Sequence, residues 1–235
     1  MVRKALVIGD VHGMIDHLEQ LLKQWSPESE QLIFVGDYID RGVDSRQALL
    51  LVHELTLLKG AVALRGNHEA MLIDYLNNPQ DYWTQYYLNS GNTTVADLLN
   101  LPLEEISQES GEVYQREILE NYPWLLPWLE SLPYYTEFGE FIIVHAGIDL
   151  EIEDWRDSPL DTFLWTRDEF LSANNQTGRP IIFGHTPTIT IQPEGGLYEG
   201  PDGKFGIDGG AVYDLALIGL KITPDAVDEV ITITI

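Results

Sequence analysis

Gly36-Asp37-Tyr38-Ile39-Asp40-Arg41-Gly42 is the stretch that decides how the rest of this sequence is interpreted. It follows the apolar run 32–35, which we expect to form a buried strand. Two carboxylates and an arginine between two glycines are unusual in a structural turn, whereas ligands of open α/β sheets bind at the carboxyl ends of strands. The stretch therefore predicts a site in which Asp37 bridges two metal ions and Arg41 receives a phosphate.

The first third of the chain repeats this arrangement of a strand followed by glycine and polar residues. An expected strand at 5–8 ends at Gly9-Asp10-Val11-His12-Gly13, and another at 61–64 ends at Gly66-Asn67-His68-Glu69. Between successive strands, apolar residues recur at helical spacing. The alternation of strands and helices indicates parallel strands with right-handed crossovers.

A change of composition follows, and then the strands return. Residues 73–137 are rich in tryptophan and tyrosine, and we interpret them as a helical insertion that covers one side of the site. Most of these aromatic side chains are expected in the core. Further strands are expected at 141–144, which ends at His145-Ala146-Gly147, and at 180–183, which ends at Gly184-His185.

The last part of the chain predicts one helix and several strands. The helix is expected near 161–172 and carries Arg167. Beyond residue 187, turn-separated apolar segments predict a second sheet rich in antiparallel pairs. These segments are 188–192, 197–199, 204–207, 212–222 and 227–235. Since no repeat or linker interrupts the chain, we expect a single domain over 1–235.

The charge of the chain excludes some partners. Thirteen Lys and Arg stand against 38 Asp and Glu, which gives a net charge of −25. Proteins that bind nucleic acid need a basic face, and anionic membranes attract basic segments, so neither partner is expected. An acidic surface attracts cations and favours substrates with basic or neutral flanks, although most of the charge is explained by solubility.

The absence of cysteine narrows the chemistry. With no cysteine in the sequence, a disulfide, a zinc–thiolate site and a cysteine nucleophile are all impossible. The apolar stretch at the N-terminus is too short for a signal peptide, and no run approaches the ~18 residues of a membrane span. We therefore expect a cytoplasmic protein; nothing in the sequence specifies its oligomeric state.

The polar residues at the strand ends form a set with the chemistry of a two-metal site. Oxygen and imidazole donors without thiolate suit Mn, Fe or Zn. Two metals need a shared carboxylate and separate ligands on each side, which six of these residues supply, and the seventh is free for acid–base work. The set consists of Asp10, His12, Asp37, Asn67, His68, His145 and His185.

Each member alone also has a structural explanation. Asp10 and Asp37 can cap the helices that follow them, and His145 alone is typical of a core histidine. Arg167 on a helix is commonly a solvated charge. Five such coincidences in order are hard to sustain, so the joint set favours a site.

The five motifs, in this order, resemble those of calcineurin-like metallophosphoesterases, and most closely the bacterial and phage Ser/Thr protein phosphatases. They span residues 9–185, about three quarters of the chain. The resemblance implies an α/β fold, a β-sandwich of two mixed sheets flanked by helices. It also implies metal-dependent phosphomonoester hydrolysis by a hydroxide that bridges two metal ions, with Mn favoured and Fe or Zn as alternatives.

The resemblance assigns roles to the residues that match its motifs. Asp10 and His12 would bind one metal, and Asp37 would bridge. The second metal would be completed by Asn67, His145 and His185. His68 would be the general acid with Asp40 as its orienting partner, and Arg41 and Arg167 would hold the phosphate.

Several functions remain compatible with this family. The main expectation is a phosphoprotein phosphatase, because the similar symmetrical dinucleoside tetraphosphatases typically lack the acid that matches Asp40. The alternative is a hydrolase of small phosphorylated molecules such as dinucleoside polyphosphates. A nuclease is disfavoured by Pro187, where that branch typically has histidine, and by the net charge. The complete ligand set disfavours a catalytically silent metal-binding module.

Overall fold

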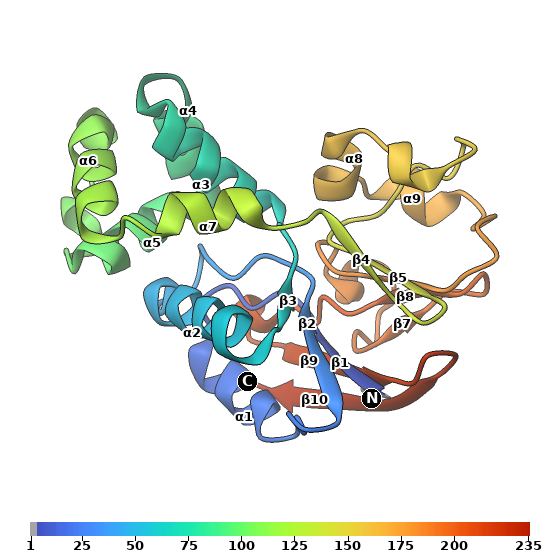
Figure 1. Cartoon of the computed structure of the whole chain (residues 1–235). Coiled ribbons are helices and arrows are strands. Elements are labelled where there is room, and N and C mark those ends of the chain that lie inside the picture. The colour runs from blue at the N-terminus through green and yellow to red at the C-terminus, as the bar shows by residue number, and fades with distance from the viewer. Residues whose placement is uncertain (1–3) are drawn as a thin grey trace.

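Two five-stranded mixed sheets, flanked by helices, form the frame of the protein in a computed structural model that describes residues 4–235 (Figure 1). The first sheet has the order β10-β9-β1-β2-β3 and the second β4-β5-β6-β8-β7. This confirms the expected α/β architecture. The strands are β1 (Lys4–Ile8), β2 (Glu30–Phe34), β3 (Val62–Ala63), β4 (Tyr135–Phe138), β5 (Phe141–Val144), β6 (Ile181–Phe183), β7 (Tyr198–Glu199), β8 (Lys204–Gly206), β9 (Ala216–Ile222) and β10 (Val227–Thr234).

The first sheet begins as the sequence predicts. β1, β2 and β3 are parallel, and they are connected by α1 (Ile15–Leu22) and α2 (Ser45–Lys59). Gly60 ends α2 in the left-handed conformation with φ 67°, which glycine adopts without steric cost. The other edge of β1 pairs with β9, an antiparallel neighbour from the end of the chain.

The C-terminal strands are divided between the sheets, which corrects the expectation that they form a second sheet together. β9 and β10 join the first sheet. In the second sheet, β8 pairs with β6 in parallel and with β7 antiparallel. The second sheet is also parallel in its centre, since β5 pairs with β6 in parallel. The apolar pattern marks these segments as strands but carries no information about their partners.

Alternate side chains of the central strands enter different layers of the core. Ala5 and Val7 of β1 pack between the two sheets, with Ile143 of β5 on the opposite side. Leu6 and Ile8 face the helices on the outer side of the first sheet. The period of two along a strand produces this division, so both faces of the sheet are apolar. In a third apolar cluster, the helices after β5 pack against the outer face of the second sheet.

In the segment where we expected a helical insertion, five helices lie above the first sheet (Figure 1) and share an apolar core with it. The tryptophans Trp83 and Trp128 of this segment are buried, as expected for core side chains. The predicted bounds of 73–137 are inexact, because the first helix begins at Asn67 and β4 begins at Tyr135. The helices are α3 (Asn67–Asn77), α4 (Pro79–Tyr86), α5 (Asn92–Leu99), α6 (Gly111–Asn121) and α7 (Leu125–Ser131).

Two local predictions were wrong. The helix expected near 161–172 is broken into α8 (Leu160–Trp165) and α9 (Asp168–Ser172), because Arg167 has φ −136° and ψ −92°. The strand expected at 188–192 is a short 3₁₀ turn, in which Thr190 N donates to Pro187 O. Within residues 4–235, no helix is long and apolar enough to cross a membrane.

Candidate metal centre

The polar residues that follow β1, β2, β3, β5 and β6 meet at the ends of the two sheets, beneath the helices. They contain two groups whose potential ligand atoms all lie within 4.8 Å of one another. Asp37 belongs to both groups, joining His12 and His68 in one and His145 and His185 in the other. A carboxylate shared by two groups is the arrangement that two neighbouring cations require.

The backbone of this region is strained in a way that aims the side chains inward. Among the described residues, eight that are not glycine have a positive φ, and five of them belong to the predicted site. Such conformations cost roughly 1–3 kcal/mol each and persist where the surroundings impose them. The five are His12, Asp37, Asp40, Arg41 and His185.

Two of the motif glycines are required by close packing against carboxylates. A Cβ at Gly66 would lie 2.2 Å from Asp37 Oδ1, and a Cβ at Gly184 would lie 2.1 Å from Asp10 Oδ1. Any side chain there would displace a carboxylate. The glycines that precede the polar residues therefore do more than permit a turn.

His12 and Arg41 lie on one side of Asp37. His12 Nδ1 donates to the Ile39 carbonyl at 2.7 Å, which leaves the lone pair on Nε2, 3.5 Å from Asp37 Oδ2. Arg41 Nη1 lies 2.6 Å from the same nitrogen. A cation bound by His12 would need that lone pair. The Arg41 guanidinium would then have to turn away, toward the space where a phosphate would lie.

His145, His185 and Asn67 lie on the other side of Asp37. Asn67 Oδ1 is 2.9 Å from both His145 Nε2 and His185 Nδ1, and His145 Nε2 is 3.5 Å from Asp37 Oδ1. The second nitrogen of His145 is held by the Val35 carbonyl at 3.1 Å. The Nε2 atom of His185 is buried and lacks a hydrogen-bond partner among residues 4–235. Such an atom is costly unless something else binds there.

Asp10 is buried beside the two groups without belonging to either. Its carboxylate accepts the backbone N–H of His185 at 3.0 and 3.1 Å. Burial, with the charges of Asp208 and Asp37 nearby, raises the Asp10 pKa well above its ordinary value. Three neighbouring buried carboxylates repel one another, and cations would relieve that repulsion.

The protonation of the cluster suits cation binding. Burial lowers the pKa of His12 to about 3 and that of His185 to about 2, and it also lowers the pKa of His145, so all three imidazoles are neutral at pH 7. Burial alone would raise the Asp37 pKa, but the positive charges that the surrounding histidines carry when protonated outweigh burial and lower the pKa. Neutral imidazoles around an ionised carboxylate are the donor forms that divalent cations bind.

His68 is held by an independent hydrogen-bond network. Its Nδ1 donates to Asp40 Oδ2 at 2.7 Å, and Tyr86 and Thr94 from the helical insertion donate to the other carboxylate oxygen. Burial alone would lower the His68 pKa, but the charges of Asp37 and Asp40 outweigh it and raise the pKa. The network fixes which nitrogen of His68 carries the outward-facing proton.

Arg167 lies at the edge of the same cluster. Its Nη1 donates to the His185 carbonyl at 2.9 Å and to Thr186 Oγ1 at 3.2 Å. Trp165 packs edge-on against the His185 ring, with centroids 6.1 Å apart. The break between α8 and α9 therefore brings both residues to the candidate site. All ten predicted site residues lie in this one region.

Comparison with known families decides between the possible classes of site. Residues 3–208 match the family model described as calcineurin-like phosphoesterase. The chain belongs to this family. The expectation of a calcineurin-like metallophosphoesterase, and with it an enzyme that binds metal, is confirmed.

Named relatives of this calcineurin-like phosphoesterase fall into two groups. Serine/threonine-protein phosphatase 1 of Salmonella typhimurium is 30% identical over 190 residues, covering 79% of each chain. An asymmetrical bis(5'-nucleosyl)-tetraphosphatase, PrpE of Oceanobacillus iheyensis, is 28% identical and covers 79% of this chain and 78% of its own. Among solved structures, a putative diadenosine tetraphosphatase superposes with a TM-score of 0.66 at 20% identity, covering 99% of this chain and 94% of that one, which shows the fold alone.

The residues of this phosphoesterase fit a pair of divalent cations. The unpartnered His185 nitrogen, the neutral imidazoles and the shared Asp37 carboxylate form a donor set without thiolate. Such a set suits Mn, Fe or Zn. The fit rests on the side chains alone and does not select one metal.

Sequence reasoning missed residues that support the site. Glu69 is fully buried, and its carboxylate accepts the backbone N–H groups of Asp37, Tyr38 and Gly66 at 2.8 to 2.9 Å. Asp208 is buried beside Asp10, and burial raises its pKa to about 6.

No local signal in the sequence identifies Tyr86 and Thr94, which support Asp40. Tyr86 and Thr94 meet Asp40 from 46 and 54 residues away. Their spacing has no periodicity in the sequence. For Glu69, the signal was its position directly after His68 in the third motif, where an acid on the buried side of a helix needs a partner.

Proposed function

We propose that this protein removes phosphate from phosphorylated serine or threonine in proteins, using two divalent cations. One observation carries the proposal: the buried pair of His68 and Asp40, 2.7 Å apart, beside the candidate metal ligands. An alkoxide leaving group needs a proton, and a positioned imidazolium typically accelerates its departure by about 10²–10⁴-fold. The Asp40 carboxylate favours the charged form of His68 and fixes its orientation.

The cation ligands in this proposal are those that meet around Asp37. Asp10 and His12 would hold one cation, Asn67, His145 and His185 the other, and Asp37 both. When bound, the cations would acidify a water molecule and neutralise phosphate oxygens. We propose manganese for assay, because carboxylate and imidazole donors suit it.

Arg41 and Arg167 would orient the phosphate from two sides. Arg41 reaches the cluster from the loop after β2, and Arg167 from the break between α8 and α9. A guanidinium binds two phosphate oxygens at once through its planar fork, which a lysine cannot do. The two arginines would therefore fix the phosphorus in line with the attacking and leaving oxygens.

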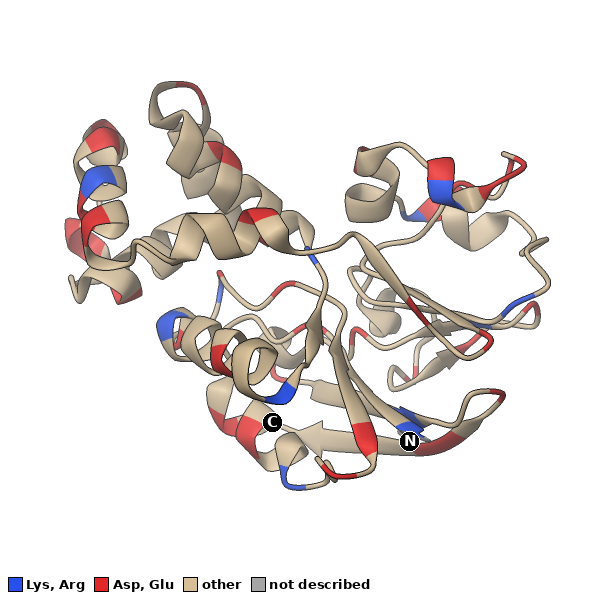
Figure 2. Cartoon of the chain, viewed as in Figure 1, with Lys and Arg blue, Asp and Glu red and all other residues tan. Residues whose placement is uncertain are grey.

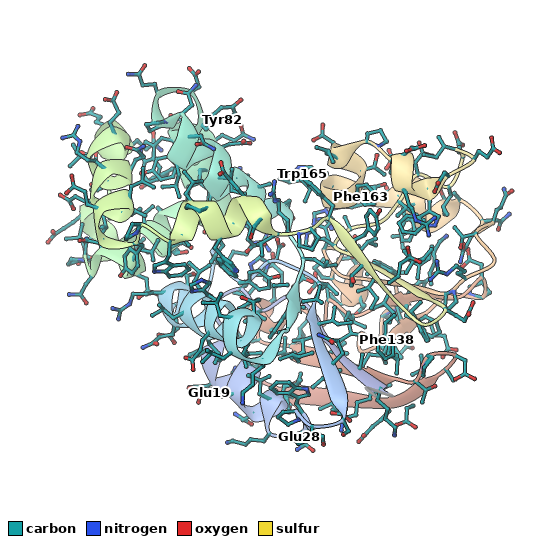
Figure 3. All side chains as sticks on the ribbon, in the orientation of Figure 1. Glu19, Glu28, Tyr82, Phe138, Phe163 and Trp165 are labelled. Carbon is teal, nitrogen blue, oxygen red and sulfur yellow. The ribbon has the colours of Figure 1, made fainter. Side chains whose placement is uncertain are left out.

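Hydrolysis of dinucleoside polyphosphates is the second candidate. The presence of Asp40 disfavours a symmetrical tetraphosphatase, whereas PrpE of Oceanobacillus iheyensis carries the asymmetrical name. Trp165 and Tyr82, 41% and 40% exposed, also line a cavity of about 350 Å³ between α4 and α8, and both rings are labelled in Figure 3. Exposed rings beside a phosphate site can stack on a nucleobase.

A substrate panel tests these proposals against each other. With Mn²⁺ present, kcat/KM is measured for phosphoserine and phosphothreonine peptides, mononucleotides and both diadenosine tetraphosphate cleavage modes. We expect peptides to exceed the nucleotides by at least about tenfold. A reversed order contradicts the protein phosphatase proposal and supports the second candidate. Substitution of Trp165 by alanine should then reduce the nucleotide rates selectively.

A further inference from the structure

A second cavity has Arg41 in its lining. It has a volume of about 490 Å³ and lies between the loop after β2, helix α5 and the segment 100–103. Gly42 and Val43 of the loop and Leu103 of the segment 100–103 are also among its walls. None of the roles assigned above involves this cavity beyond Arg41, so its occupant has to be inferred from its walls.

The walls of this cavity are mainly aliphatic. Val43 and Leu103 are 80% and 47% exposed, and they line the cavity together with further aliphatic residues, so the apolar surface is contiguous. Ala96, Leu101 and Pro102 extend the apolar surface. Within the described part of the chain, no aromatic ring lines the cavity.

Two of the polar side chains of the cavity, those of Asp97 and Thr93, are already engaged. Asp97 Oδ2 accepts the backbone N–H of Arg46 at 2.6 Å, and Thr93 Oγ1 donates to the Ser90 carbonyl at 2.8 Å. These bonds reduce the capacity of both side chains to recognise a polar ligand. A ligand would therefore gain mainly by burying apolar surface here.

The cavity is joined to the catalytic machinery through one helix and one loop. Thr94 of α5 hydrogen-bonds the Asp40 carboxylate, while Thr93 and Ala96 of the same helix line the cavity. Arg41, which follows Asp40, belongs to both the cavity and the proposed phosphate site. A group bound in this cavity would therefore be close to the phosphate in the same substrate molecule.

We infer that this cavity binds an aliphatic side chain of the residue that flanks the phosphorylated serine or threonine in a peptide substrate. The inference rests on the proposed protein phosphatase function and adds a sequence preference to it. A nucleobase fits the cavity less well, because stacking needs a ring and base edges need free hydrogen-bonding groups. A charged flanking side chain would lose hydration against Val43 and Leu103.

Peptides that differ only beside the phosphoserine test the inference. We compare leucine, alanine and aspartate at the position before and at the position after it. In wild type, leucine on one of the two sides should raise kcat/KM by about tenfold over alanine, the scale on which an apolar pocket discriminates. The difference should arise in KM, because the cavity lies outside the reacting atoms.

Variants assign that preference to the cavity. Leu103→Asp should abolish the leucine preference, Leu103→Met should retain it, and Leu58→Asp, a matched change at a leucine on α2 that is 68% exposed, should leave it intact. The peptide rates are normalised to p-nitrophenyl phosphate, which has no flanking residue. Thermal melting confirms that each variant is folded.

The outcomes separate the inference from the proposed function. Peptides that are all hydrolysed equally well, or a leucine preference that survives Leu103→Asp, overturn the inference alone. Failure to hydrolyse any phosphopeptide while dinucleoside tetraphosphates are cleaved overturns both. If Leu103→Asp impairs only nucleotide substrates, the cavity holds a nucleoside and the inference is wrong.

Discussion

Asp40 shows how single contacts determine the orientation of the proposed acid, His68. Its carboxylate binds His68 on one oxygen and receives the Tyr86 and Thr94 hydroxyls on the other. A buried carboxylate with both oxygens bonded is rigidly oriented. The imidazole that it holds is consequently fixed in direction, which a catalytic acid requires.

Substitution of His68 by asparagine tests the proposed acid. The variant should retain bound metal, because His68 is not among the proposed ligands, whereas kcat should fall by about 10²–10⁴-fold on substrates with poor leaving groups. Phenyl phosphate and a phosphoserine peptide serve as such substrates, and p-nitrophenyl phosphate should be affected much less. Metal content is measured by atomic emission.

A matched control for this variant is His53→Asn. His53 stacks on Trp124 with ring centroids 4.0 Å apart and has no role in the proposed acid network. The His53→Asn variant should leave the dependence of kcat on the leaving group unchanged. An unchanged kcat of His68→Asn on phenyl phosphate would remove His68 from the acid role.

Much of the candidate site could be predicted at the residue scale, and the limit is physical. The ligands follow strand ends, and strand ends are visible as apolar runs that stop at glycine. Glu69 and Asp208 are supporting groups whose partners are backbone N–H groups or distant carboxylates. Asp208 meets its carboxylate neighbours only after the chain has folded, so its local sequence carries no sign of that contact, whereas the position of Glu69 directly after His68 was a partial signal.

At the scale of elements, predictions failed where local propensity competes with a tertiary contact. The segment 161–172 has helical spacing, yet Arg167 leaves the helix and its side chain bonds His185 and Thr186. The segment 188–192 is apolar enough for a strand, but Pro187 precedes it and Thr188 N donates to the Asp208 carbonyl. Tertiary contacts therefore override the local helix and strand propensities of the segments next to the site.

An ion pair at the start of β8, between Lys204 and Asp202, is hydrogen-bonded to the segment after α9. Lys204 is buried, and its ammonium lies 2.9 Å from Asp202 Oδ2 and also donates to the Ala173 carbonyl. Burial alone would raise the Asp202 pKa, but the Asn175 N–H and Lys204 outweigh it and lower the pKa. A buried ammonium without its partner is costly, so the pair stabilises this side of the second sheet.

Substitution of Asp202 by asparagine should destabilise the protein by about 1–3 kcal/mol at pH 7, since it leaves Lys204 without its counter-charge. The folded pKa of Asp202 lies below its unfolded value of about 3.9, so the contribution is complete above that pH and is lost as the pH falls through the folded pKa. Urea unfolding of dilute protein at pH 7 and pH 3 measures the difference.

The exposed Glu19 on α1, labelled in Figure 3, provides the control. Glu19→Gln should change the free energy of unfolding by less than about 0.5 kcal/mol at either pH. A destabilisation by Asp202→Asn that is as large at pH 3 as at pH 7 would show that the ion pair is not its cause.

At the scale of the whole molecule, acidic side chains are spread over the outer surfaces. Figure 2 shows them on the outer helices of the insertion, around α8 and α9 and on the C-terminal hairpin, with few basic residues between them. The net charge of −25 repels anions at a distance. In the proposed mechanism, anionic substrates would therefore depend on Arg41, Arg167 and the cations for local attraction.

Removal of metal tests how far the molecule depends on its cations. The proposed ligands come from segments between residues 10 and 185, so cations would tie distant parts of the chain together. EDTA should abolish phosphatase activity, and Mn²⁺ at about 100 times its Kd should restore it and stabilise the fold by about 2.7 kcal/mol. For a chain of this size, that corresponds to a rise in Tm of roughly 5–10 °C.

Calcium is the matched control for this experiment, because imidazole ligands disfavour it. It should neither restore activity nor raise Tm to the same extent. Full turnover by enzyme shown to be free of metal would contradict the two-cation proposal. A rise in Tm with Mn²⁺ that persists in Asp37→Asn would place the binding elsewhere.

The overall topology was only partly predictable. The β-α-β order requires parallel β1, β2 and β3, and the structure agrees. The pairing of β1 with β9 joins residues about 210 positions apart, and an apolar strand carries no signal for such a partner. Apolar alternation therefore identified the strands at the end of the chain but not the sheet that each one joins.

The position of β1 between β2 and β9 has a consequence for the synthesis of the protein. One edge of β1 can pair with β2 early in synthesis, but the other edge has no partner until Ala216–Ile222 has been made. At ribosomal rates of about 5–20 residues per second, that edge stays open for roughly 10–40 seconds of synthesis. During this interval the nascent chain presents unpaired N–H and C=O groups, which are a template for pairing with other chains.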